Sequence, residues 1–192
     1  TGNCFSRKEI QELIESYPGI VVLDEAYYDF SGLTFLDQMQ DHNNLVILRS
    51  LSKIGLAGLR VGYGIFPREL ADEINKVRMP YNSNSISQIA AAELLKNFSL
   101  VQSQIDSIKN ERKRLLKELS KMKSITAFPS DSNFILFKAA NNGEKLFYDL
   151  IENGVLIRNL GSHPMLKNCL RVTIGTKYEN DQFLELLTQA SQ

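Results

Sequence analysis

Long hydrophobic runs, clustered cysteines and an excess of charge of one sign are all missing from this 192-residue sequence. No apolar stretch approaches the length of a membrane-spanning helix, and no basic start followed by an apolar segment indicates a signal peptide. We therefore expect a cytoplasmic protein without a membrane partner. Because 22 basic residues balance 22 acidic ones, we expect no nucleic-acid partner either.

Cysteine and histidine are too scarce and too scattered to indicate a metal site or a disulfide scaffold. Cys4 and Cys169 lie far apart without metal-ligand spacing, which fits a reducing compartment and two packed thiols. His42 and His163 stand in polar loop segments with no second ligand nearby. We expect no bound metal.

The hydrophobic content of 43% can supply a core, and the apolar pattern predicts an α/β fold. A helix is predicted over 6–16, then strands over 20–23 and 45–48 that read as buried on both faces. A third strand is predicted over 59–66, where two glycines indicate close backbone neighbours. Helix, strand and strand in this order predict a mostly parallel sheet covered by helices.

The second half of the chain combines helices with short strands. Helices are predicted over 68–77, 85–95, 100–122, 144–152 and 179–190, and strands over 133–138, 155–158 and 170–174. We divide the chain inside the long helix, into a large α/β domain over 1–98 and a small α+β domain over 99–192.

The long helix has one apolar and one charged side. The apolar side holds Ile105, Ile108, Leu115, Leu116 and Leu119. The charged residues are Lys109, Glu111, Arg112, Lys113, Arg114, Lys117 and Glu118. No aromatic residues interleave for base stacking, so a solvated face is favoured over a nucleic-acid patch.

Residues 50–60, Ser-Leu-Ser-Lys-Ile-Gly-Leu-Ala-Gly-Leu-Arg, follow a predicted strand and bring together groups that suit a phosphate and a carbonyl. The hydroxyls of Ser50 and Ser52 and the guanidinium of Arg60 could cradle a phosphate dianion. Lys53 beside them could form an imine with an aldehyde cofactor. Taken alone, a lysine at this position would far more often be a surface lysine.

A carboxylate and a phenol follow the first predicted strand, at the edge where open α/β sheets bind ligands. Asp24 could pair with a protonated pyridine nitrogen, and Tyr27 could hydrogen-bond a phenolic oxygen on the same ring. The alternatives are a turn cap for Asp24 and ordinary core packing for Tyr27.

These stretches together resemble a known family. Asp-Glu-Ala-Tyr after a valine-rich strand, then Ser-x-Ser-Lys and Gly-Leu-Ala-Gly-Leu-Arg-Val-Gly-Tyr, resemble fold type I aminotransferases, especially histidinol-phosphate aminotransferases. The resemblance implies pyridoxal 5'-phosphate as cofactor, held by Lys53 as a Schiff base. It also implies ring contacts from Asp24 and Tyr27, and phosphate contacts from Ser50, Ser52 and Arg60.

The predicted small domain resembles the same family around two arginines, Arg158 in Leu-Ile-Arg and Arg171 in Leu-Arg-Val-Thr-Ile-Gly-Thr. The resemblance implies that Arg171 clamps the substrate α-carboxylate, and a buried arginine does need an anionic partner. An internal salt bridge is the alternative for Arg171. Arg158 is a candidate for the substrate's phosphate end or the rim of the site.

The sequence departs from the family pattern in two places. The spacing from Lys53 to Arg60 is one residue shorter than the family's, which predicts a tighter loop. Thr1-Gly2 resembles the tail of the family's Asn-Pro-x-x-Pro-Thr-Gly motif, whose asparagine touches the cofactor ring. We therefore expect a truncated enzyme whose isolated chain binds the cofactor weakly and turns over negligibly.

The expected activity is transfer of the amino group of L-histidinol phosphate to 2-oxoglutarate, within histidine biosynthesis and in a homodimer. Two alternatives remain open. One cofactor also supports a decarboxylase acting on threonine phosphate, because the protein decides which bond breaks. The chain could instead be a non-catalytic fragment that serves as a binding or dimerisation surface.

Overall fold

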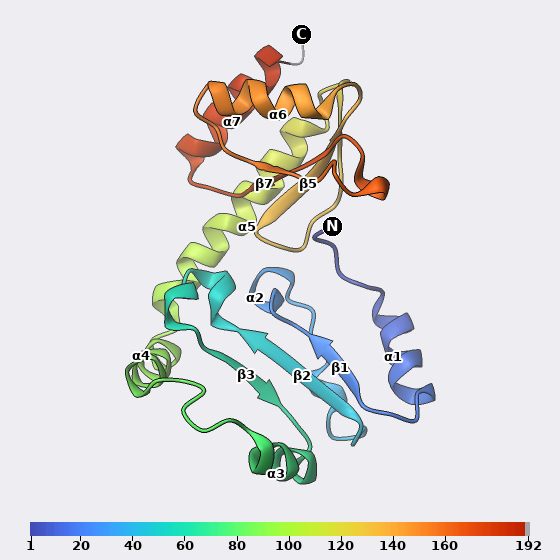
Figure 1. Cartoon of the computed structure of the whole chain (residues 1–192), viewed down its shortest axis with the longest axis vertical. Coiled ribbons are helices and arrows are strands. Elements are labelled where there is room, and N and C mark those ends of the chain that lie inside the picture. Colours follow the sequence, from blue (N-terminus) through green and yellow to red (C-terminus); the bar gives the residue numbers. More distant parts are fainter. Residues whose placement is uncertain (191–192) are drawn as a thin grey trace. The chain divides into compact units, whose positions relative to one another are not determined.

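The computed structural model describes residues 1–190, which fold into two compact units (Figure 1). The N-terminal unit spans Cys4–Ser103, and the C-terminal unit comprises Thr1–Asn3 together with the chain from Gln104 onward. The division between the units falls inside helix α5 (Ser99–Leu119). The functional boundary between 1–98 and 99–192 stays a prediction.

The N-terminal unit is an α/β layer with several short 3₁₀ helices. Its elements are α1 (Arg7–Ser16), β1 (Val21–Asp24), α2 (Tyr28–Ser31), η1 (Leu36–Gln38), β2 (Leu45–Ser50), η2 (Leu51–Ile54), η3 (Ala57–Leu59), β3 (Gly62–Ile65), α3 (Arg68–Val77) and α4 (Ser85–Lys96).

The sheet of this unit has the order β1-β2-β3 (Figure 1). β1 pairs parallel with β2, Asp24 lying opposite Leu48, whereas β3 pairs antiparallel with β2, Gly62 lying opposite Ser50. A Cβ atom at Gly62 would lie 2.9 Å from the carbonyl oxygen of Arg49. The predicted close backbone neighbour is thus real at this glycine.

One face of the β1-β2-β3 sheet carries a hydrophobic core of the N-terminal unit, where α1 and the loop after α2 pack. The buried members of this core are Ile14, Val21, Phe35, Leu45 and Ile47. The prediction that β1 is buried on both faces is wrong, because Val22 on the other face is 54% exposed. A short apolar run cannot reveal which of its side chains will meet a covering layer.

The C-terminal unit is an antiparallel sheet of the order β4-β5-β7-β6 packed against helices (Figure 1). Its elements after α5 are β4 (Ile125–Ala127), β5 (Phe134–Ala139), α6 (Gly143–Glu152), β6 (Arg158–Asn159), η4 (Pro164–Leu166), β7 (Cys169–Thr173) and α7 (Lys177–Ala190). The strand predicted over 155–158 is reduced to two residues, which start at Arg158.

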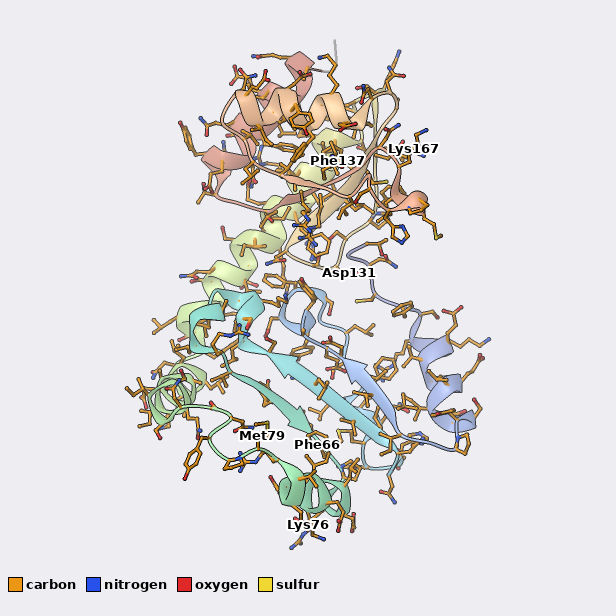
Figure 2. All side chains as sticks on the ribbon, in the orientation of Figure 1. Phe66, Lys76, Met79, Asp131, Phe137 and Lys167 are labelled. Carbon is orange, nitrogen blue, oxygen red and sulfur yellow. The ribbon has the colours of Figure 1, made fainter. Side chains whose placement is uncertain are left out.

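The core of the C-terminal unit lies between this sheet and helices α5, α6 and α7. Phe137 on β5 is fully buried in it and its ring lies 5.9 Å from that of Phe183 on α7 (Figure 2). The predicted apolar side of α5 is confirmed: Leu115 and Leu119 are fully buried here, and Ile108 and Leu116 pack against the same core.

One residue assigned to the solvated side of α5 is buried instead. Arg112 is only 9% exposed, and its Nη1 donates a hydrogen bond of 2.7 Å to the carbonyl oxygen of Ser132. Helical periodicity explains the correction, because Arg112 stands seven residues after Ile105 and three before Leu115, on the apolar side. Its charge alone suggested otherwise.

Across residues 1–190 no helix is both long enough and apolar enough to cross a membrane.

Candidate active site

The carboxyl ends of the parallel strands β1 and β2 lie at the same edge of the sheet, and Asp24 stands at that edge. Oδ1 of Asp24 accepts a hydrogen bond of 2.9 Å from the backbone N–H of Ala26. The turn cap that was the alternative for Asp24 therefore exists, and it fixes the carboxylate at the strand end. Asp24 is exposed on the sheet face that also carries Leu48 and Ser50.

Lys53 and Tyr27 come together from different segments. Lys53 lies in η2, after β2, and its Nζ is 5.2 Å from the centre of the Tyr27 ring. Both residues are half-buried. A cation above an aromatic face is attracted to it, so the ring helps to hold the amine near Asp24's strand end.

The loop that contains Lys53 folds around its own polar groups. Oγ of Ser50 accepts a hydrogen bond of 3.2 Å from the N–H of Ser52 and so caps η2. Gly55, with φ of 92°, ends this 3₁₀ helix in the left-handed conformation that favours glycine. The hydroxyls predicted to bind phosphate thus lie within one turn of Lys53.

Arg60 closes the same loop in a strained conformation. Its φ is 56°, uncommon for a residue with a long side chain, and its Nη1 donates to the carbonyl oxygen of Ala57 at 3.4 Å. The side chain is exposed. The phosphate-binding role of Arg60 stays a prediction.

A buried ion pair next to these residues was missed by sequence reasoning. Glu25 is 9% exposed and its Oε2 accepts from Nη2 of Arg49 at 2.9 Å and from Nε at 3.2 Å. The same oxygen accepts from the Thr34 hydroxyl at 2.9 Å, and Oε1 accepts from the N–H of Phe35 at 2.8 Å. Both carboxylate oxygens are therefore hydrogen-bonded.

The guanidinium of Arg49 is held from several sides. It stacks over the Tyr28 ring at 3.7 Å, and its Nη2 also donates to Oγ1 of Thr34 at 2.9 Å. Desolvation alone would lower the pKa of Arg49, but hydrogen bonds to Glu25 and Tyr63 outweigh it and raise the pKa above its ordinary value. Arg49 therefore stays charged.

The sequence does contain a signal for this pair. Glu25 is the residue after β1 and Arg49 lies near the end of β2. Because parallel neighbouring strands end at one edge, opposite charges at these two positions predict an ion pair. The signal was overlooked because Asp24, next to Glu25, drew the functional interpretation.

Arg158 and Arg171 are neighbours on the C-terminal unit. They lie directly opposite each other in the β6-β7 pairing. Arg171 is half-buried, with its guanidinium 4.7 Å from the Phe134 ring centre, whereas Arg158 is exposed. Like charges directly opposite each other repel, so an anion between them would be stabilising.

Two other features bear on ligands. Among residues 1–190 no three side chains of His, Cys, Asp or Glu gather in a way that could hold a metal ion. An open cavity of about 590 Å³ lies in the C-terminal unit, lined among others by Asn142, Asn159 and Lys167, the last labelled in Figure 2. Its lining includes none of the predicted site residues.

Known proteins match this chain along almost its whole length. The histidinol-phosphate aminotransferase of Neisseria gonorrhoeae is 45% identical over 188 residues, 97% of this chain and 52% of that protein. The chain thus spans about half the length of the curated relatives it matches.

Solved structures of aminotransferases also match the chain over its length. The histidinol-phosphate aminotransferase of Clostridium acetobutylicum is 29% identical, with a TM-score of 0.89 over 100% of this chain and 60% of that one. The Sinorhizobium meliloti histidinol-phosphate aminotransferase, solved with pyridoxal-5'-phosphate, shares the fold at 23% identity, with a TM-score of 0.85 over 100% of this chain and 54% of that one.

The sequence profile of one family, aminotransferase class I and II, matches residues 1–187. That range includes the carboxylate at the end of β1, the lysine of η2 and the paired arginines of β6 and β7. This chain belongs to the aminotransferase class I and II family.

Proposed function

We propose that this chain carries the cofactor-binding part of a pyridoxal 5'-phosphate enzyme that transfers the amino group of L-histidinol phosphate to 2-oxoglutarate. The products are imidazole acetol phosphate and glutamate. The observation that carries the proposal is the amine of Lys53, 5.2 Å from the Tyr27 ring in the unit whose strand end bears Asp24. The relatives at 43–45% identity named histidinol-phosphate aminotransferase support the substrate.

The residues present fit this cofactor by their chemistry. An aldehyde needs an amine, and Lys53 supplies one after β2. A phosphate dianion needs N–H and hydroxyl donors and a cation, which the loop of Ser50, Ser52 and Arg60 contains. A pyridine nitrogen that stays protonated needs a carboxylate, and Asp24 stands exposed at the strand end.

When bound, the cofactor supplies an aldehyde carbon and an electron-withdrawing ring. Lys53 would hold that carbon through Nζ, and the same amine would be the group placed to move a proton at the substrate carbon that bears the amino group. Asp24 would pair with the ring nitrogen, and Tyr27 would donate its O–H to the ring oxygen.

Arg171 and Arg158 bind the anionic end of the substrate in this proposal. Their direct pairing across β6 and β7 supports it, because two adjacent cations favour an anion. Arg171 takes the carboxylate of glutamate or 2-oxoglutarate, and Arg158 contacts the phosphate of histidinol phosphate. The first substrate has no carboxylate on its amino-bearing carbon, so the two arginines must accept both kinds of anion.

We also propose that the enzyme is located in the cytoplasm and forms a homodimer. The family resemblance supports both, and the exposed apolar side chains on and between α3 and α4, Val77, Met79, Tyr81, Ile86 and Ile89, fit a subunit contact. Met79 is labelled on this segment in Figure 2. Light scattering of the full-length protein should give twice the subunit mass.

The decisive assay is product analysis with the full-length protein. Histidinol phosphate and 2-oxoglutarate should yield glutamate, and phosphothreonine should yield no carbon dioxide. Carbon dioxide from phosphothreonine without glutamate from the first pair would instead establish the decarboxylase. Neither product, from a folded protein that binds no cofactor, would favour a non-catalytic role.

A further inference from the structure

We propose that the Glu25–Arg49 ion pair is a positioning device, which holds Asp24, Tyr27 and Ser50 in the arrangement that binds the cofactor. The inference rests on the proposed function. It assigns a role to two residues that touch none of the reacting atoms in that proposal, and it makes their loss visible in cofactor binding rather than in folding alone.

The pair ties together three segments that meet at the ligand edge of the sheet. Glu25 directly follows β1, Arg49 lies in β2, and Thr34 lies in the loop after α2. Thr34 donates to Glu25 at 2.9 Å and accepts from Arg49 at 2.9 Å. Within residues 1–190 no buried side-chain nitrogen or oxygen lacks a hydrogen-bond partner, so this network is fully satisfied.

Each partner of the pair is the chain neighbour of a proposed cofactor contact. Glu25 follows Asp24, and Arg49 precedes Ser50. Successive strand residues point to opposite faces, so Arg49 lies on the face opposite Ser50. The backbone N–H of Glu25 also donates to the carbonyl oxygen of Leu48 at 2.8 Å. The pair therefore fixes the two strand ends from one face of the sheet, while Asp24 and Ser50 lie on the opposite face, where the ligand is proposed to bind.

The pair also contacts Tyr28, the chain neighbour of the phenol beside Lys53. The guanidinium of Arg49 stacks 3.7 Å from the centre of the Tyr28 ring, and the N–H of Tyr28 donates to the carbonyl oxygen of Glu25 at 2.9 Å. Tyr28 is thus held by both members of the pair. Its neighbour Tyr27, whose ring lies 5.2 Å from Nζ of Lys53, is oriented through this anchor.

A purely stabilising role accounts poorly for this arrangement. A buried ion pair contributes little net stability, because desolvation of both charges offsets their attraction, and apolar residues often serve as well. Apolar residues cannot make directional hydrogen bonds that orient their neighbours. The planar guanidinium of Arg49 makes two hydrogen bonds to one carboxylate oxygen and stacks on a ring at the same time.

The test compares cofactor affinity with stability in the full-length protein. Glu25→Gln keeps the shape and removes the charge, Arg49→Lys keeps the charge and removes the planar fork, and Thr34→Val removes the bridging hydroxyl. The control is Glu111→Gln, which breaks a partly shielded ion pair with Arg114 in the C-terminal unit, away from the proposed cofactor contacts. The readouts are the dissociation constant for pyridoxal phosphate, the pH midpoint of its visible absorbance band and the urea midpoint.

We expect each of the first three variants to weaken cofactor binding by about tenfold or more and to move the pH midpoint. Glu111→Gln should leave both unchanged. Folded variants that keep the wild-type affinity and pH midpoint would overturn the inference while leaving the proposed function intact. Failure of all three variants to fold would overturn it in favour of a structural role. A wild-type protein that binds no pyridoxal phosphate would overturn the proposed function first.

Discussion

The two units of the molecule are stabilised in different ways. The C-terminal unit packs three helices on one face of an antiparallel sheet, around a core that includes Leu115, Phe137, Leu150, Leu170 and Phe183. The N-terminal unit packs Ile14, Phe35 and Ile47 on one face of its sheet, and on the other face Val46 is buried while Val22 is 54% exposed. The N-terminal unit carries Asp24, Tyr27, Ser50, Ser52, Lys53 and Arg60.

The two units fix the positions of their side chains by different interactions. In the C-terminal unit, apolar packing fixes the side chains, since closely packed interiors resist movement. In the N-terminal unit, hydrogen bonds fix the catalytic candidates: Ala26 to Asp24, Ser52 to Ser50, and the network of Glu25 and Arg49. Substitutions in the core of the C-terminal unit should therefore change the free energy of unfolding. Substitutions at the catalytic candidates of the N-terminal unit should change turnover or cofactor binding.

The largest expected effect is on the chemistry of the N-terminal unit. Asp24→Asn in the full-length protein removes the charge that keeps the ring nitrogen protonated, and we expect turnover to fall by about a thousandfold, roughly 4 kcal/mol. The urea midpoint should hardly change, because Asp24 is exposed. Steady-state kinetics beside urea unfolding measures both, and near-normal turnover would contradict the role of Asp24.

In the C-terminal unit the corresponding substitution is Phe137→Ala. Its side chain is fully buried and contacts Phe183, so the cavity left behind should cost about 3–5 kcal/mol in the free energy of unfolding. Cofactor affinity of the fraction that stays folded should not change. A loss below about 1 kcal/mol would mean that this core is looser than its packing indicates.

A smaller effect depends on pH. The hydrogen bond from Arg114, assisted by one from Asn180, lowers the pKa of Glu111 in the folded protein. The folded pKa lies below the unfolded value of about 4.3, so this stabilisation is present above that pH and is lost as the pH falls through the folded pKa.

Glu111→Gln should therefore destabilise the protein by less than about 1 kcal/mol at pH 7. The difference from wild type should shrink as the pH drops below about 4. Urea unfolding at a series of pH values measures it, and a difference that grows towards acid pH would reverse the assigned sign.

The smallest expected effect is at the exposed face of the N-terminal sheet. Val22→Thr keeps the β-branched shape at a site that is 54% exposed, so we expect a change in unfolding free energy within about 0.5 kcal/mol. A loss of about 2 kcal/mol or more would show that a further layer covers Val22 in the full-length protein.

Local periodicity predicted most of the helices and strands, but it could not predict which residues they pack against. The helices over 7–16 and 68–77 and the parallel strands β1 and β2 follow from apolar spacing and breakers. The short β4 was missed, because three residues carry too little pattern.

Burial was harder to predict than helix and strand. The exposure of Val22 depends on neighbours from distant parts of the chain, which a local pattern does not contain. The burial of Arg112 follows from its helical spacing to Ile105 and Leu115, which its charge obscured.

The candidate site was predictable where residue chemistry is distinctive. The structure brings Lys53 to the ring of Tyr27 and leaves Asp24 at the strand end, although their roles stay predictions. The Glu25–Arg49 pair was missed although opposite charges near the ends of two neighbouring parallel strands predict it, because Asp24 beside Glu25 drew the functional interpretation.

Covalent trapping tests the central claim most directly. Pyridoxal phosphate is added to the full-length protein, borohydride reduces the linkage, and peptide mass mapping locates the label, with Lys53→Arg as the control. The account predicts the label on Lys53 in the wild type and none in the variant. A label on another lysine, or an equal label in Lys53→Arg, would contradict it.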